Sequence, residues 1–117
     1  FTHFFAHESC GFCTPCRVGS SLLKKQLDKI VDGHGSAGDI VALEELCQLV
    51  KNYSHCGLGQ TAANPILSTL QRYPEIYQQQ LKNISFEPGF DLDASLATAR
   101  QLADRDDVNA HLTQVEE

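Results

Sequence analysis

The chain has 117 residues, and its 9 basic and 15 acidic side chains give a net charge of −6. The acidic excess lies in residues 83–117, because residues 1–82 hold seven charges of each sign. This distribution argues against nucleic-acid binding, which requires clustered lysine and arginine. Five cysteines, an odd number, do not suit a disulfide scaffold and favour a reducing compartment in which thiols bind metal.

Residues 1–8 place aromatic side chains at positions 1, 4 and 5, which is helical spacing. Because the sequence begins with Phe1 rather than methionine, we expect a fragment or processed piece of a longer protein, with this segment as the end of a helix that began earlier. The next segment, residues 10–16, contains Gly11 and Pro15, so we expect a tight loop there.

Four helices are predicted between residues 17 and 81. Apolar residues recur at helical spacing over residues 17–32 and 39–52, with Asp39 as the expected N-cap of the second helix. A loop is expected at residues 54–60, followed by helices at 62–73 and 74–81 that are separated by Pro74. The apolar positions expected to face the core are Val18, Leu22, Leu23, Leu27, Ile30, Val31, Ile40, Leu43, Leu46, Cys47, Val50, Ile66, Leu67 and Leu70.

The composition changes at Asn83, where Pro88-Gly89 indicates a turn and Asp93 is expected to cap a short helix at 94–103. The sequence predicts an all-α protein: a small antiparallel bundle of about four helices in residues 1–82, with a loop-held metal cluster, and an acidic tail in residues 83–117. No apolar run approaches the ~20 residues of a membrane span and no signal peptide is visible, so we expect a cytoplasmic protein without direct membrane insertion.

The strongest chemical pattern is the cysteine spacing. Cys10, Cys13 and Cys16 lie three residues apart, and Cys56 follows in a second loop. One turn of backbone can bring three thiolates to one centre, and a fourth from elsewhere completes the ligand set of a 4Fe–4S cluster, which predicts electron transfer. One alternative is a zinc-stabilised helical structural or interaction module, although zinc usually takes two separated cysteine pairs. Thiol–disulfide chemistry is another, although it would leave two of the cysteines unexplained.

Residues around the cysteines suit an anionic cluster. Gly11, Gly57 and Gly59 would let the backbone approach the cluster sulfurs without a Cβ. Cys16 falls near the N-terminus of the first long predicted helix, whose dipole favours negative charge, and Arg17 would add a cation.

The remaining chemistry-bearing residues give weaker patterns. Cys47 lies on the apolar face of a predicted helix and is expected to be a small buried hydrophobe. His55, next to Cys56, could donate a hydrogen bond to the cluster, although an exposed loop histidine is the more ordinary interpretation. No nucleotide-binding glycine motif or nucleophile motif is present, and no catalytic residue is predicted.

Two motifs together resemble a known family: the C-terminal region of the NADH-binding flavoprotein subunit of respiratory complex I, and the related diaphorase subunits of NAD-reducing hydrogenases and NAD-dependent formate dehydrogenases. The first motif is Phe4-Phe5-x-x-Glu8-Ser9-Cys10-Gly11-x-Cys13-x-Pro15-Cys16-Arg17-x-Gly19. The second is Cys56-Gly57-Leu58-Gly59, followed by Pro65-Ile66-Leu67-x-x-Leu70 and Pro74-Glu75-Ile76-Tyr77.

The resemblance implies that Cys10, Cys13, Cys16 and Cys56 ligate one 4Fe–4S cluster in a helical domain that follows an FMN- and NADH-binding domain. It implies that single electrons pass from reduced FMN to further iron–sulfur centres. The implied partners are that FMN/NADH-binding domain of the same parent subunit and the other iron–sulfur subunits of the complex. The glycine-rich FMN and NADH site of the family is not in this chain, so the chain alone is not expected to oxidise NADH.

Two positions depart from the respiratory members of the family. Many of those carry an acidic residue at the position of Val18, and alanine at the position of Gly57. The sequence Cys56-Gly57-Leu58-Gly59 looks closer to the hydrogenase and formate-dehydrogenase diaphorases.

Overall fold

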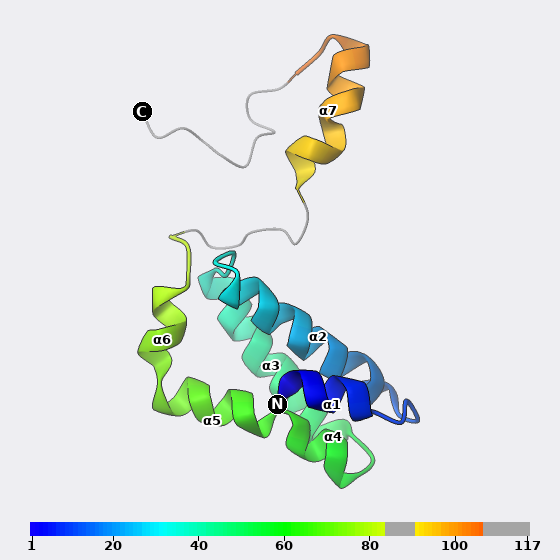
Figure 1. The fold of residues 1–117 in the computed structure, drawn as a ribbon, viewed down its shortest axis with the longest axis vertical. Helices are drawn as coiled ribbons and strands as arrows, with labels where there is room; N and C mark the ends of the chain where they lie inside the picture. The colour runs from blue at the N-terminus through cyan, green and yellow to red at the C-terminus, as the bar shows by residue number, and fades with distance from the viewer. Residues whose placement is uncertain (84–90, 107–117) are drawn as a thin grey trace. The chain divides into compact units, whose positions relative to one another are not determined.

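The computed structural model describes residues 1–83 and 91–106, and these form seven α-helices and no strand (Figure 1). The all-α class predicted from the sequence is therefore confirmed. The chain divides into two compact units, Phe1–Glu87 and Pro88–Glu117. The boundary expected at residue 83 remains a prediction. In the described part of the chain, no helix combines the length and the apolar character needed to cross a membrane.

The first unit is built around one antiparallel helix pair. Its helices are α1 (Thr2–Glu8), α2 (Thr14–Val31), α3 (Ala37–Tyr53), α4 (Gly57–Ala62), α5 (Asn64–Arg72) and α6 (Pro74–Gln79). α2 and α3 lie side by side along most of their length, and α1 and α4 pack against α2 and against each other (Figure 1). The start of α2 and the start of α4 therefore lie at the same end of the unit, which is where the predicted ligands are.

The core lies between α2 and α3 and extends to the start of α5. Its fully buried members are Leu23, Ile30, Leu43, Cys47, Val50, Ala62, Ala63 and Ile66, with Leu27, Ile40, Leu46, Leu67 and Leu70 packed around them. Gly19 of α2 meets Val50 of α3 so closely that a Cβ on the glycine would overlap the valine side chain. This glycine lets the two longest helices approach each other beside the cysteine loop.

The predicted apolar face of α2 is wrong at three positions. Val18, Leu22 and Val31 are exposed, Val31 at 71%. The helical period places them beside the stripe that contacts α3, so they add apolar character to a face that residues 1–83 and 91–106 leave exposed.

Three predicted helix starts are also wrong. α2 begins at Thr14 rather than at residue 17, with Pro15 in its first turn. The N-cap of α3 is Ser36, not Asp39, and these two side chains form a capping box in which each bonds the other's backbone N–H. In the second unit, α7 (Leu92–Ala103) is capped by Asp91, whose carboxylate accepts a hydrogen bond from the Ala94 N–H, rather than by Asp93.

The predicted loop at 54–60 and helix at 62–73 are corrected to two short helices. α4 starts at Gly57 with Cys56 as its N-cap, so most of the expected loop is helical. α5 starts at Asn64, with Pro65 in its first turn. Proline has no N–H to continue the preceding hydrogen-bond ladder, and the chain therefore turns at Ala63 instead of running as one helix.

Asp39 links the start of α3 to α2, and its ionisation makes the stability of the folded protein fall at acid pH. Burial raises the pKa of this carboxyl, but hydrogen bonds from the Lys29 ammonium and from the hydroxyl and N–H of Ser36 outweigh burial and hold the pKa below its ordinary value of 3.8. Since the folded state holds the proton less tightly than the unfolded state, this contribution is complete above about pH 4 and is lost as pH falls below it.

We therefore expect Asp39→Asn to lower the melting temperature at neutral pH by about 5 °C, or ~1 kcal/mol, and to flatten its fall below about pH 4. Asp28→Asn is the matched control, because Asp28 pairs with Lys24 on the exposed surface of α2 and should change stability by less than ~0.5 kcal/mol. Thermal melts monitored by circular dichroism, from neutral pH to below about pH 4, measure the melting temperatures of both variants and of wild type. Parallel pH curves for wild type and Asp39→Asn would contradict the assignment.

Candidate cluster site

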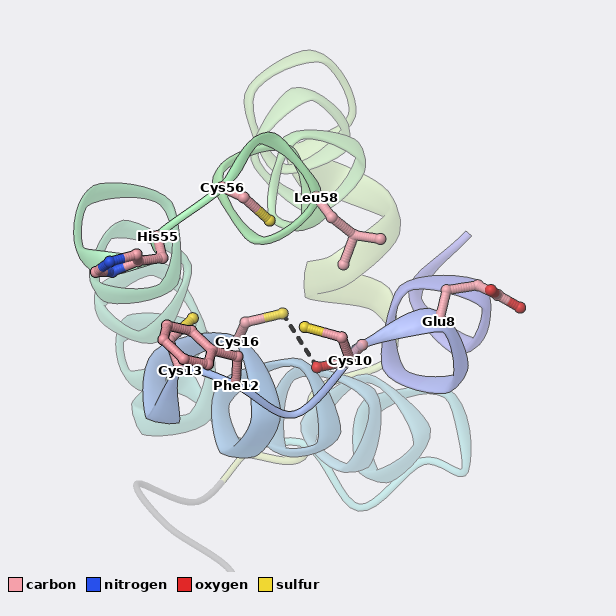
Figure 2. A pocket seen from close by; sticks show the side chains of 9 residues that line it. Glu8, Cys10, Phe12, Cys13, Cys16, His55, Cys56 and Leu58 are labelled. Carbon is pink, nitrogen blue, oxygen red and sulfur yellow. Dashed lines mark hydrogen bonds between the residues drawn. The ribbon is translucent and has the colours of Figure 1, made fainter.

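The four predicted ligands line one cavity. Its volume is about 310 Å³, and it is lined by Glu8, Ser9, Cys10, Phe12, Cys13, Cys16, His55, Cys56 and Leu58. Figure 2 shows the sulfur atoms of Cys10, Cys16 and Cys56 directed toward a common space, whereas the sulfur of Cys13 lies behind the ring of Phe12 in this view. The structure thus brings together residues that are 40 positions apart in the sequence.

Three of these cysteines lie at the first residues of helices, which fixes their positions. Cys13 is the N-cap of α2, Cys16 lies in the first turn of that helix, and Cys56 is the N-cap of α4. Cys10 lies in the short segment between α1 and α2. The first turn of a helix has N–H groups without intrahelical partners, so the cavity is bordered by donors suited to an anionic group.

The thiol of Cys13 joins the two cysteine-bearing segments. The pKa of Cys13 is lowered from its ordinary value, most by hydrogen bonding from the backbone of His55 and next by that from the backbone of Cys16. Hydrogen bonds from N–H groups favour the thiolate, which is the form that binds metal. His55 therefore contributes to the site through its backbone, whereas the hydrogen bond considered from the sequence was one from its imidazole.

Arg17 holds the shape of the cysteine loop. Its guanidinium Nη1 donates a hydrogen bond of 2.9 Å to the carbonyl oxygen of Gly11. Gly11 has φ of +77°, a left-handed conformation that L side chains rarely adopt, and this explains the glycine between the first two cysteines. The guanidinium is thus both a nearby cation and a clamp on the loop.

Ser9 and Phe12 also contact the site, and Ser9 bonds within the loop that carries the cysteines. The Ser9 Oγ lies 3.2 Å from the Cys16 Sγ and accepts a hydrogen bond from the Gly11 N–H. A serine two residues before a glycine is a known pattern for such a side-chain-to-backbone turn. The ring of Phe12 packs edge-on against the ring of His55, with 5.5 Å between centroids.

Gly59 brings α4 against the first turn of α2. A Cβ built on Gly59 would overlap Ser54 and lie 3.0 Å from the Cys16 Cβ, so only glycine allows this approach. At Gly57 a Cβ would meet no protein atom within 4 Å, so no protein contact accounts for the glycine predicted to be needed there.

The donor set fits a cluster of several irons. Among residues 1–83 and 91–106, no three cysteine, histidine or carboxylate side chains converge closely enough to hold one metal ion. Four thiols around a roomy cavity suit a group in which each iron takes its own thiolate. The Ser54 hydroxyl, which directly precedes His55 of the cavity wall in the sequence, is buried against Gly59 and has no hydrogen-bond partner in the described part of the chain.

Cys47 lies outside the site, as predicted. It is fully buried in the core on α3, and burial, assisted by Glu44, raises the pKa of its thiol to about 12. It is therefore a neutral thiol at physiological pH and does not compete as a ligand.

Comparisons with known proteins identify the family to which this chain is similar. Residues 1–80 match the family described as the NADH-ubiquinone oxidoreductase-F iron-sulfur binding region. The chain is 41% identical over 95 residues to the NAD-reducing hydrogenase HoxS subunit alpha of Cupriavidus necator, covering 80% of this chain and 16% of that protein. It is 38% identical over 110 residues to an NADH-quinone oxidoreductase subunit of Streptomyces coelicolor, covering 94% of this chain and 23% of that protein.

A solved structure shows the same fold. The crystal structure of an NAD⁺-reducing NiFe-hydrogenase in the H₂-reduced state superposes with a TM-score of 0.77 and 43% identity, covering 99% of this chain and 20% of that chain. The chain thus spans about a fifth of the length of these larger proteins. Taken with the four cysteines around one cavity, the match over residues 1–80 shows that the chain belongs to the NADH-ubiquinone oxidoreductase-F iron–sulfur binding region family, and that its cofactor is a 4Fe–4S cluster.

Proposed function

We propose that this chain is an electron-transfer domain in which Cys10, Cys13, Cys16 and Cys56 hold one 4Fe–4S cluster. The observation that carries the proposal is the single cavity lined by all four cysteines. When bound, the cluster accepts and releases single electrons. In the parent protein, reduced FMN would supply the electrons and further iron–sulfur centres would receive them.

The protein's own contribution is to hold the thiolates and to stabilise their charge. Backbone N–H groups from two segments stabilise the thiolate of Cys13, and the Arg17 guanidinium fixes the loop. Packing of α1 and α4 against α2 positions the remaining thiols, of which Cys16 is buried. Covalent bonds from both segments to one cluster would couple cofactor binding to folding.

The partner proposed for this domain is an FMN- and NADH-binding domain of the same subunit, with other iron–sulfur subunits beyond it. Larger relatives named as a hydrogenase subunit and an NADH-quinone oxidoreductase subunit support this, because this chain corresponds to about a fifth of each. Exposed apolar side chains, among them Phe12 at the cavity and Phe4 and Val18 on α1 and α2, supply surface that such a domain could cover.

Metal analysis tests the proposal directly. The chain, reconstituted with iron and sulfide without oxygen, is expected to hold about four irons and four sulfides and to show a brown absorbance that dithionite bleaches. Reduction should produce the electron paramagnetic resonance signal of a one-electron-reduced cluster. A colourless protein with one zinc ion and no iron would overturn the proposal in favour of a structural zinc module.

A further inference from the structure

We propose that Ser9 raises the reduction potential of the bound cluster by donating a hydrogen bond from its hydroxyl to the Sγ of Cys16. The inference rests on the proposed function, because it requires Cys16 to be a cluster ligand. It assigns Ser9 as a positioning residue, acting on the centre through the thiolate that it contacts. The short distance between Ser9 Oγ and Cys16 Sγ, 3.2 Å, is the starting observation.

Ligation decides the direction of this hydrogen bond. In the free thiol either atom could donate. A cysteine that ligates iron is a thiolate without a proton, so only the serine hydroxyl can then donate. The sulfur becomes the acceptor of a charge-assisted hydrogen bond.

The neighbouring backbone orients the hydroxyl for this purpose. The N–H of Gly11 donates to the Ser9 Oγ at 3.3 Å and occupies one of its lone pairs, which leaves the hydroxyl proton for the sulfur. Arg17 fixes Gly11 through the carbonyl oxygen, so the donor chain is tied to the first turn of α2. Hydrogen bonds in such a chain polarise and strengthen one another.

Burial makes the hydrogen bond effective. Cys16 is 5% exposed, so water has little access to its side chain. The nearby Ser20 hydroxyl does not replace Ser9, because it donates to the carbonyl oxygen of Cys16 rather than to the sulfur. Of the hydrogen bonds given by the described residues, the Ser9 bond is the one that joins a side-chain hydroxyl to a cysteine sulfur.

The sign of the effect follows from charge. One-electron reduction adds one negative charge to the centre and its thiolates, and no proton is required for balance. A hydrogen bond to the ligand sulfur therefore stabilises the reduced form more than the oxidised form and raises the potential. The size of the shift is set by how much the hydrogen bond strengthens on reduction. A strengthening of roughly tenfold in an equilibrium constant lies within what a hydrogen bond to a charged group supplies, and it is about 59 mV for a one-electron couple.

The test compares the reduction potentials of four reconstituted variants with that of wild type. Each potential is measured by a redox titration monitored by electron paramagnetic resonance. Ser9→Ala and Ser9→Val remove the hydroxyl, whereas Ser9→Thr keeps it and has nearly the shape of valine. Ser21→Ala is the control, because its exposed hydroxyl faces the Arg17 carbonyl oxygen. We expect iron content to stay at wild-type level and the potential to fall by about 59 mV in the alanine and valine variants, with threonine and the Ser21 control close to wild type.

Each outcome is decisive. Equal potentials in the valine and threonine variants, with full iron content, would overturn the inference while leaving the proposed function intact. Loss of iron from both hydroxyl-free variants, with retention in threonine, would also overturn it, because the hydroxyl would then hold the site rather than set its potential. Absence of a cluster from wild type would show instead that the proposed function itself has failed.

Discussion

Cys56→Ser is expected to abolish assembly of the 4Fe–4S cluster, reducing iron from about four per chain to near zero. In the proposed site Cys56 supplies the thiolate of the second segment, and the cavity lining includes no other cysteine from that segment. A serine oxygen is a hard ligand with a much higher pKa, so it replaces a soft thiolate poorly. Iron and sulfide analysis after reconstitution without oxygen measures the loss.

The same substitution is expected to lower the melting temperature of the reconstituted protein by on the order of 10 °C, because binding to the folded state no longer adds to stability. The cluster-free chains provide an internal control. Cys56 is exposed and is the N-cap of α4, a position where serine is favoured. Cluster-free Cys56→Ser should therefore be at least as stable as cluster-free wild type, so a deficit confined to the reconstituted protein reports ligation.

Cys47→Ala separates cluster loss from damage to the core. Removing a fully buried sulfur leaves a small cavity and should cost about 1 kcal/mol, while the iron content stays at the wild-type level. Equal iron content in Cys56→Ser and wild type would contradict the ligand assignment. Loss of iron from Cys47→Ala would show that cluster binding follows general stability instead.

The helical class was predictable because apolar periodicity is a property of the chain itself. Leu43, Cys47 and Val50 recur at helical spacing, and the structure buries all three. Helix starts were harder, since capping depends on competition among neighbouring polar residues. Asp39 was expected to cap α3, but Ser36 occupies that position and Asp39 completes the capping box from the third residue of the helix.

The candidate ligands were predictable for a different reason. Thiolate spacing follows from the chemistry of a cluster, so Cys10, Cys13 and Cys16 predict a candidate site before any helix is placed. The surroundings required tertiary structure. Two features could not be predicted from the local sequence: the effect of the His55 backbone on the pKa of Cys13, and the packing of Gly59 against Ser54 and Cys16. Each depends on how the fold arranges the backbone around the cysteines.

Gly59→Ala is expected to cost about 2–3 kcal/mol, or roughly 10 °C in melting temperature, and to impair cluster retention. The new methyl group would overlap Ser54 and press on the Cys16 Cβ, so α4 would have to move away from α2. Cys56 is the N-cap of the same helix, and a shift of α4 would displace its sulfur from the other three. Thermal melts with parallel iron analysis measure both effects.

Gly57→Ala is the matched control within the same helix. Both substitutions carry the same gain in helix propensity, up to ~1 kcal/mol, but a Cβ at Gly57 meets no protein atom within 4 Å. Gly57→Ala should therefore keep its cluster and melt at or above the wild-type temperature. Adding Ser54→Gly to Gly59→Ala removes the overlapping atoms and should restore part of both properties. If Gly59→Ala behaved like Gly57→Ala, the close approach of α4 to the first turn of α2 would not be what holds Cys56 at the site.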